Sequence, residues 1–360
     1  MLSTCRVFYR KGVRFFSCPA CKEMTRGSLP VHFRKVHPDL WDRYRHDFLE
    51  LFKQGLSATQ IMRRYRTFFT SKVIDREIRH LVEEKNIRLD NVALTNSIKH
   101  APRCFTEKAR TSVWSFPKRG DWSVHDGRYP GNWPPQVVRN LLCAYTRRGD
   151  TVLDPFLGGG TTAIECMLLR RKCIGTDLSP YAIAVSRSKI RQLQRHMSIA
   201  GGWVPKIMKN DCRSLTSVKT SSVDFVCGQP PYWNAVRYTA AEPGDLSRIT
   251  DPNKFYTEMS LVASEIKRVL KTGKRCAVLI GDVRRHGILV PVGFNVMSVF
   301  LHAGLELQEI IIKVQHNDRS SRFYATKNSK VKFRLAHEYL LVFKKTRKRL
   351  RSSIRRSSKT

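Results

Sequence analysis

Thr151-Val-Leu-Asp-Pro-Phe-Leu-Gly-Gly-Gly-Thr-Thr162 is the stretch of sequence that decides the fold. Its first four residues form a short apolar segment that predicts a strand, and its three glycines let the backbone approach a ligand closely. A helix is expected through Ile164, Met167 and Leu168, followed by a second strand from Lys172 to Asp177. This order of strand, glycine loop, helix and strand predicts a Rossmann-like nucleoside-binding unit in an α/β protein.

The same stretch excludes two other kinds of phosphate site. The loop is not G-x-G-x-x-G, so the pyrophosphate of a dinucleotide is not indicated, and no G-K-[ST] follows, which removes the P-loop interpretation. Asp177, 19 residues after Gly158, ends the second strand. An acid at that place is expected to accept hydrogen bonds from ribose hydroxyls.

A second strand and loop lie downstream. Ser222 to Cys227 predict another buried strand, which runs into Gly228-Gln-Pro-Pro-Tyr-Trp233. The two prolines fix φ and remove donors, so this loop is rigid. The carbonyl of Pro230 remains available as an acceptor, and Tyr232 offers a flat ring. The pattern favours gripping a planar base and accepting hydrogen bonds from its exocyclic amine, a site for methyl transfer to nitrogen.

Taken together, these segments resemble the amino-directed DNA methyltransferases, which modify N4 of cytosine or N6 of adenine. The resemblance runs from about Trp122 to Lys345 and implies a methyltransferase sheet with S-adenosylmethionine as cofactor. It implies four catalytic residues, Gln229, Pro230, Pro231 and Tyr232. It also implies a set of cofactor-binding residues: Tyr129, Pro130, Asp154, Phe156, Gly158, Gly160, Thr161, Thr162, Asp177 and Asp211.

One position departs from the family pattern. The family has Asp, Asn or Ser before Pro-Pro-Tyr, where this chain has Gln229, which is longer and uncharged. Trp233 resembles the form found in cytosine-N4 enzymes, so cytosine is favoured over adenine. Two alternatives stay open: an RNA amino-methyltransferase, and a zinc-dependent DNA-binding regulator with an inactive methylase body. The resemblance also connects the chain with restriction–modification.

The N-terminal region carries a metal-ligand pattern. Cys18 and Cys21 are followed by His32 and His37, a C-x2-C-x10-H-x4-H spacing. A hairpin can present two thiolates and a helix, expected from Ser28 to Val36, can present two imidazoles, which together complete a tetrahedral zinc site. The pattern resembles a two-Cys, two-His zinc finger with a short central spacer, and implies structural Zn²⁺.

Residues 46–100 predict helices. Gly55 is expected to end one helix, Ser57 to cap the next, and Thr70 or Ser71 to cap a third. The arrangement resembles a helix-turn-helix, whose last helix would offer basic side chains to nucleic acid: Lys72, Arg76, Arg79 and His80. A plain helical bundle is the alternative.

Net charge indicates the partner. Lys and Arg number 66 against 29 Asp and Glu, a formal charge of +37, spread as +10 over residues 1–100, +18 over 101–343 and +9 over 344–360. Such a field attracts polyanions, so DNA, with RNA as the alternative, is the expected partner. Oligomeric state cannot be read from the sequence.

Membrane association is not expected. The uncharged stretch from Gly287 to Leu305 contains Pro291 and His302, which favour a buried core segment over a membrane span. No secretory signal is visible in the first 22 residues, so the expected location is cytoplasmic, or nucleoid-associated in a prokaryote.

The expected organisation has four parts. They are a zinc-finger-like module over residues 1–45, a helical module over 46–100, a methyltransferase domain over 101–345 and a basic disordered tail over 346–360.

Overall fold

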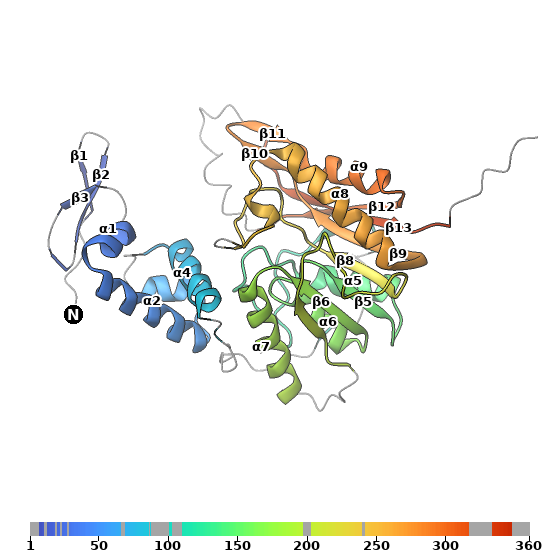
Figure 1. Ribbon diagram of the computed structural model, residues 1–360, viewed down its shortest axis with the longest axis horizontal. Helices are drawn as coiled ribbons and strands as arrows, with labels where there is room; N and C mark the ends of the chain where they lie inside the picture. The colour runs from blue at the N-terminus through green and yellow to red at the C-terminus, as the bar shows by residue number, and fades with distance from the viewer. Residues whose placement is uncertain are drawn as a thin grey trace, which may run out of the picture.

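The computed structural model describes residues 7–10, 13–18, 20–21, 24–26, 29–65, 69–85, 87, 101–102, 110–196, 203–239, 242–316 and 333–347. Ser28, expected to begin the first helix, and residues 348–360 of the expected tail lie outside these ranges. Figure 1 shows a smaller N-terminal part of strands and helices beside a larger body built on one twisted sheet.

Eight strands form the central sheet of the body, in the order β4-β12-β13-β9-β8-β5-β6-β7. They are β4 (Val113–Ser115), β5 (Thr151–Asp154), β6 (Lys172–Asp177), β7 (Lys206–Lys209), β8 (Val223–Gly228), β9 (Leu270–Ile280), β12 (Glu306–Val314) and β13 (His337–Lys344). Only β13 pairs antiparallel with its neighbours, so the described sheet is otherwise parallel. The predicted α/β Rossmann-like fold is confirmed, as are the strands over β5, β6 and β8.

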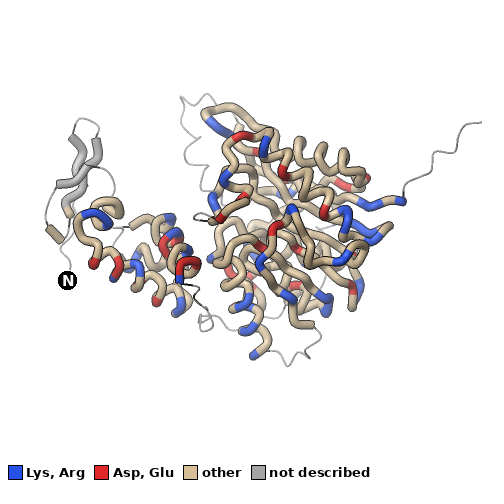
Figure 2. The backbone as a smooth tube through the Cα atoms, viewed as in Figure 1, with Lys and Arg blue, Asp and Glu red and all other residues tan. Residues whose placement is uncertain are grey.

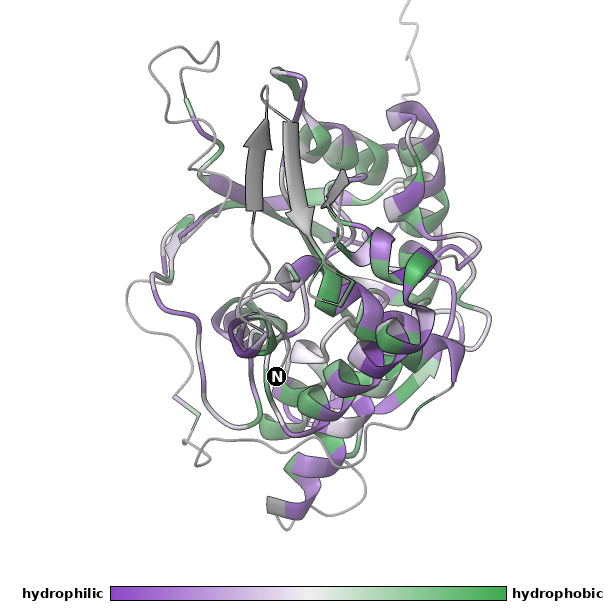
Figure 3. Ribbon diagram, turned by 90° about the vertical axis from the view of Figure 1, so that its left-hand side faces the viewer, coloured by the Kyte–Doolittle hydropathy of each residue, from purple (hydrophilic) through white to green (hydrophobic). Residues whose placement is uncertain are grey.

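Helices cover both faces of this sheet. They are α5 (Pro135–Tyr145), α6 (Thr161–Leu168), α7 (Pro180–His196), α8 (Pro252–Val269) and α9 (Val292–His302). Strand β8 is buried along its whole length: Phe225 and Cys227 pack in the core with α5, α6 and α7, whereas Val226 packs with α8 and α9. This alternation is the two-residue period of a strand covered on both sides. In Figure 3 the covering helices carry both hydrophobic and hydrophilic residues.

The stretch from Gly287 to Leu305 ends a small hairpin and then forms α9. The hairpin pairs β10 (Val283–Arg285) with β11 (Ile288–Val290). Within α9, Val296 and Phe300 are buried whereas Phe294 is 54% exposed, so this helix covers the sheet with one side only. Among the described residues, no helix is long and apolar enough to cross a membrane.

Over its described residues, the N-terminal part combines a small sheet with four helices. Its elements are β1 (Val7–Arg10), β2 (Val13–Ser17), β3 (Met24–Arg26), α1 (Leu29–Val36), α2 (Pro38–Lys53), α3 (Ala58–Arg64) and α4 (Ser71–Glu84). The predicted helix signals are present: Gly55 has φ +95° after α2, Ser57 caps α3 in a capping box, and the Thr70 hydroxyl accepts from Val73 N at the start of α4. Helix α2 runs through residue 45, so the two expected N-terminal modules share a helix.

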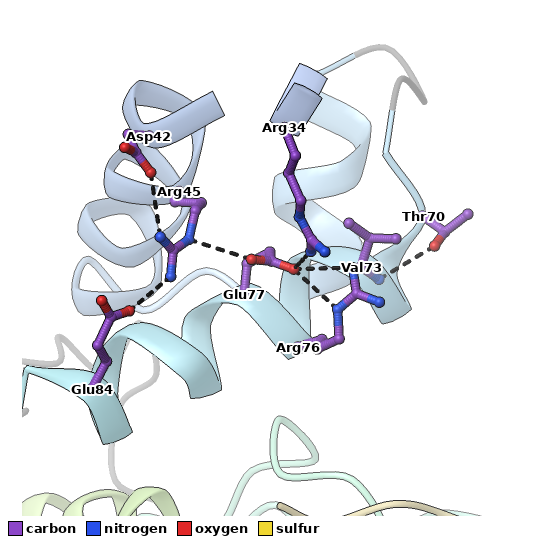
Figure 4. A network of polar contacts seen from close by, with 8 residues as sticks. All are labelled: Arg34, Asp42, Arg45, Thr70, Val73, Arg76, Glu77 and Glu84. Carbon is purple, nitrogen blue, oxygen red and sulfur yellow. Dashed lines mark hydrogen bonds and ion pairs between the residues drawn. The ribbon is translucent and has the colours of Figure 1, made fainter. Parts of the chain in front are cut away.

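A buried carboxylate holds the N-terminal helices together. Glu77 of α4 is 3% exposed and pairs with Arg34 of α1, with Arg45 of α2 at 3.3 Å and with Arg76 at 3.0 Å. Figure 4 shows the Arg34 and Arg45 guanidinium groups reaching Glu77 from two other helices, and that of Arg76 reaching it from α4 itself. Since Arg45 also pairs with exposed Glu84 at 3.0 Å, one network ties α1 and α2 to α4.

The helical part packs against α7 of the body. Phe52 of α2 lies 6.2 Å from Tyr181 of α7, measured between ring centroids, and both belong to one buried cluster. Ser179, just before α7, donates to Glu83 of α4 at 3.2 Å. The N-terminal helices are therefore fixed beside the pocket described below.

Candidate functional site

A pocket opens at the carboxyl ends of the parallel strands β5, β6, β7 and β8. Each strand supplies the loop that follows it, and residues 129–133, 238–239 and 244–246 close the remaining sides. The lining residues are Tyr129, Gly131, Asn132, Trp133, Pro155, Phe156, Leu157, Gly158, Asp177, Leu178, Asn210, Asp211, Cys212, Gln229, Pro231, Tyr238, Thr239, Gly244, Asp245 and Leu246. This is where a parallel α/β sheet binds its ligand.

Asp154 shapes the glycine loop from beneath. Its carboxylate is fully buried and accepts from Phe156 N at 2.9 Å and from the Thr162 hydroxyl at 2.5 Å. Burial raises the pKa of Asp154 to about 7, although these hydrogen bonds favour the charged form. Gly160 caps α6 with φ +83°, a conformation that a side chain would strain.

Asp177 ends β6 and lines the pocket. It accepts from Gly158 N at 2.8 Å and from Ser179 N at 2.9 Å, so the acid and the glycine loop are held in one arrangement. Burial raises the pKa of Asp177 to about 6, opposed by these two backbone hydrogen bonds. Carboxylate oxygens so placed can accept hydrogen bonds from the hydroxyls of a ribose.

Three tyrosine rings form a stack on one side of the pocket. Tyr129 lies in the middle, stacked on Tyr181 at 5.8 Å and on Tyr238 at 6.4 Å between centroids. Backbone comes close here: a Cβ on Gly131 would lie 2.1 Å from the Tyr238 hydroxyl oxygen, and one on Gly159 2.8 Å from the Cβ of Tyr129. The pocket wall is therefore built from glycine backbone against aromatic rings.

Asp211 carries an arginine partner. Arg213 donates to it at 2.6 Å and also pairs with Glu258 of α8. Burial alone would raise the pKa of Asp211, but the hydrogen bonds from Arg213 lower it, so the carboxylate is charged at neutral pH. Asp211 lines the pocket beside Gly244, where a Cβ would lie 3.1 Å from its Oδ2.

The Gln229–Tyr232 loop follows β8 directly. Gln229 donates through Nε2 to the Tyr232 hydroxyl at 2.8 Å, which donates to Glu338 of β13 at 2.7 Å. The Oε1 of Gln229 is buried and has no hydrogen-bond partner among the described residues. Burial, followed by Glu338, holds the pKa of Tyr232 well above its usual value, so the phenol keeps its proton.

The structure brings together half of the residues that the sequence singles out for cofactor and catalysis. The pocket is lined by Tyr129, Phe156, Gly158, Asp177, Asp211, Gln229 and Pro231. The others lie beside or behind it: Asp154, Gly160, Thr161 and Thr162 are within or just behind the loop, Pro230 and Tyr232 are adjacent, and Pro130 lines a groove next to α4.

Several lining residues were not predicted. Tyr238, Thr239 and Asp245 come from a loop without any motif, in which Asp245 accepts from Thr239 and Ser247 side chains, both at 2.7 Å. The only sequence signal was their position shortly after the Pro-Pro-Tyr segment. Asn132, whose side chain accepts from the Thr161 hydroxyl at 2.8 Å, lies within the segment that carried Tyr129 and Pro130.

The four predicted metal ligands converge. The ligand atoms of Cys18, Cys21, His32 and His37 all lie within 4.8 Å of one another. Cys18 follows β2, at the turn of the β2–β3 hairpin, whereas His32 belongs to α1 and His37 immediately follows it. His37 Nε2 is buried without a hydrogen-bond partner among the described residues. Two sulfurs and two imidazole nitrogens at this separation fit a tetrahedral zinc ion.

A wide groove lies between α4 and the body. It is lined by basic residues from both parts: Lys72, Arg76, Arg79, His80, Arg128, Arg237 and Arg248. Figure 2 shows basic positions on both sides of this junction. Arg79, expected to face nucleic acid, is already paired: it bonds to Asp75 at 3.0 Å and to the carbonyl oxygens of Arg237 and Tyr238 at 2.8 and 3.1 Å. It fastens α4 to the body.

The mostly parallel sheet, the glycine loop after β5 and the acid Asp177 at the end of β6 define a Rossmann-like methyltransferase fold. A family model described as DNA methylase, covering N6 and N4 methyltransferases, matches residues 68–188 and 223–359, well over half of the chain. The chain belongs to this family of amino-directed DNA methylases.

Curated relatives match over shorter segments. The type II methyltransferase M2.MboI of Moraxella bovis is 29% identical over 87 residues, which is 24% of this chain and 32% of that protein. The type II methyltransferase M.BsoBI of Geobacillus stearothermophilus is 29% identical over 138 residues, 31% of this chain and 27% of that protein. The matched segments thus span about a third of the length of these relatives.

Solved structures resemble the chain more distantly. TrmN from Thermus thermophilus superposes with a TM-score of 0.41 at 17% identity, covering 60% of this chain and 50% of that one. A SAM-dependent methyltransferase from Methanosarcina mazei has a TM-score of 0.40 at 16% identity, covering 57% of this chain and 97% of that one.

Proposed function

We propose that this protein is an S-adenosylmethionine-dependent DNA methyltransferase that modifies the exocyclic amine of a base. The observation that carries the proposal is a single pocket lined by Asp177, the glycine loop and the Gln229–Pro231 segment. An acceptor for ribose and acceptors for an amine therefore face the same space.

The pocket fits the cofactor. Asp177 offers carboxylate oxygens to the ribose hydroxyls, and Asp211 lies farther along the same wall, where it would accept from the adenosine part. Glycine backbone packs closely against Tyr129, where a Cβ on Gly158 would lie 3.0 Å from the ring, so the absence of a side chain there keeps this wall of the pocket clear. When bound, S-adenosylmethionine supplies an electrophilic methyl group on a sulfonium.

Gln229 and Pro230 would receive the target amine. Their carbonyl oxygens would accept hydrogen bonds from the N–H groups of the amine. This would leave the nitrogen lone pair available for the methyl group. Tyr232 would stack on the extruded base. When held there, S-adenosylmethionine would supply the methyl group to this nitrogen, which would release one proton to water. Positioning and desolvation carry this chemistry, so no charged catalyst is required.

Transfer of label from S-adenosylmethionine to DNA tests the proposal. We expect labelled DNA with wild-type protein. Asp177→Asn should weaken cofactor affinity about tenfold or more, because it removes a charged acceptor. Asp224→Asn, at the opposite end of β8, is the matched control and should bind cofactor normally. Cofactor binding without transfer to any DNA would refute the enzyme and support the zinc-dependent regulator.

The target base is proposed to be cytosine N4 rather than adenine N6, because of Trp233. Digesting the labelled DNA to nucleosides and separating them by mass decides between the two. Structured RNA in the same assay tests the RNA alternative. Preferential labelling of RNA would favour RNA over DNA as the substrate.

The N-terminal ligand cluster is proposed to hold structural zinc. Metal analysis should give one zinc per chain, and Cys18→Ser should lose it together with the order of the β2–β3 hairpin. Absence of bound zinc from protein purified without chelators would contradict this site.

Specificity is proposed to lie in residues 1–100, in a zinc-finger-like module and a helix-turn-helix-like module, with the methyltransferase domain over residues 101–345. The groove between α4 and the body supports this, since its basic side chains lie beside the catalytic pocket. Exchanging Lys72 and Arg76 for glutamine should change DNA affinity or site preference while leaving cofactor affinity unaltered.

A further inference from the structure

A run of polar contacts leads from strand β12 of the sheet to the pocket. The Lys313 ammonium donates to Glu338 Oε2 at 2.6 Å, the Tyr232 hydroxyl donates to Glu338 Oε1 at 2.7 Å, and Gln229 Nε2 donates to Tyr232 at 2.8 Å. Glu338 is only 6% exposed. The run ends at Gln229 Oε1, which is buried, unpaired among the described residues and part of a pocket-lining side chain.

The direction of these hydrogen bonds is determined by Glu338. A carboxylate beside an ammonium can only accept, so the single proton of Tyr232 goes to Glu338. The Tyr232 oxygen must then accept from Gln229, which only the NH₂ end of the amide can satisfy. The oxygen end of the amide is consequently the one left for a ligand.

Strand pairing holds this network in place. Lys313 of β12 and Glu338 of β13 are direct partners in the antiparallel register. The Tyr232 ring packs against backbone, since a Cβ on Gly281 would lie 2.9 Å from its Cε2. The tyrosine therefore cannot leave Glu338 without losing packing.

We propose that Glu338, held by Lys313, is a positioning residue that turns the Gln229 amide so that Oε1 receives the amine of the target base. The inference rests on the proposed function. Asparagine and glutamine present a donor or an acceptor according to how the amide is turned, whereas aspartate presents only acceptors. A glutamine at the catalytic position thus needs a group that fixes its orientation.

Glu338→Gln tests the proposal because it reverses the direction of the hydrogen bonds through Tyr232 while the side chain keeps its size and shape. Lys313 would hold the new amide by its oxygen, so the NH₂ end faces Tyr232. The tyrosine proton then goes to Gln229, whose amide must turn its NH₂ toward the pocket. We expect kcat to fall about tenfold to a hundredfold, with KM for S-adenosylmethionine within about twofold of wild type. An unchanged kcat would overturn the proposal.

A second substitution separates orientation from folding. Gln229→Glu alone puts two carboxylates in competition for one tyrosine proton and should also be impaired. Combined with Glu338→Gln, however, it leaves a free carboxylate oxygen for the amine, so the double variant should exceed both single variants in kcat. If Glu338 had only a structural role, the double variant would show no such rescue. A double variant that is no faster than the single variants would therefore overturn the proposal.

Solvent exchange of the Gln229 side-chain amide gives a readout independent of turnover. Its ¹⁵N resonance is assigned by its loss in Gln229→Glu. The amide protons should exchange with water faster in Glu338→Gln than in wild type, because the NH₂ group turns from Tyr232 to the pocket. Equal exchange rates would refute the assigned orientation. A wild-type protein that transfers no methyl group would refute the proposed function and leave this result standing.

Discussion

Asp154 shows how one residue can shape a site without facing it. Its carboxylate binds Phe156 N and the Thr162 hydroxyl, and so fixes both ends of the glycine loop from below. The cost is a fully buried acid whose pKa is raised to about 7. The loop is thus built on a group that changes charge near neutral pH.

This raised pKa gives a pH dependence of stability. The ordinary value is 3.8, so between about pH 4 and 7 the folded state binds a proton that the unfolded state has lost. The free energy of unfolding should therefore fall as pH rises through this range, by up to about 4 kcal/mol from this group, and level off above it.

Urea unfolding of wild-type protein and of Asp154→Asn at pH 5 and pH 8 measures the pH dependence of stability that Asp154 contributes. Asparagine does not titrate, so the stability of wild type relative to the variant should be lower at pH 8 than at pH 5. A difference that does not change with pH would contradict the shifted pKa.

Individual site residues could be predicted where the signal is local. Asp177 and Gly158 lie in one continuous stretch, and the sequence predicted that both would face a nucleoside. Tyr238 and Glu338 could not be found in the same way. Tyr238 faces the pocket because its ring stacks on Tyr129, 109 positions earlier in the sequence, and Glu338 matters because β13 brings it next to Tyr232.

Among the elements, α4 has the most unexpected role. Its basic residues predicted a helix that contacts nucleic acid, but Glu77 on its buried face binds three arginines, and Arg79 binds backbone carbonyls of the body. A sequence pattern shows that a residue is charged, not which partners the fold gives it. The helix thus supports the structure on one side and offers Lys72 to the groove on the other.

Glu77→Gln should destabilise the N-terminal helices strongly. It removes a buried charge from three guanidinium groups, and loss of one partner from a buried ion pair costs about 3 kcal/mol. Glu84→Gln is the matched control, because Glu84 is on the same helix, pairs with Arg45 and is 60% exposed, so it should cost less than about 1 kcal/mol. Chemical unfolding monitored by tryptophan fluorescence compares them, and equal losses would show that burial of Glu77 is unimportant.

At the scale of the whole molecule, part of the +37 charge is gathered in the groove beside α4, where basic residues of both parts of the chain lie. The sequence predicted an excess of positive charge in every region but could not show where it converges. That depends on the packing of α2 and α4 against α7, which joins distant segments. The body fold was predictable because its strands and loops alternate regularly; the placement of the N-terminal part was not.

Salt dependence should map this convergence. The logarithm of the DNA association constant should fall linearly with the logarithm of salt concentration, and removing one phosphate contact should make this slope shallower by about 0.9. Lys72→Gln and Arg237→Gln, on opposite sides of the groove, should each do so. Lys254→Gln, an exposed position on α8, should leave the slope unchanged. Equal slopes for all variants would place the phosphate contacts elsewhere.

The tyrosine stack has a thermodynamic consequence. Phe52 of the N-terminal helices contacts Tyr181, which stacks on Tyr129, which stacks on Tyr238 inside the pocket. We expect a ligand that orders the pocket end of this column to stabilise the docking of α2 at its far end, and such a coupling free energy is the same in both directions. Cofactor affinity and the docking of the N-terminal helices would then be linked quantities. A protein that engages DNA through those helices should bind its methyl donor more tightly than the free protein does.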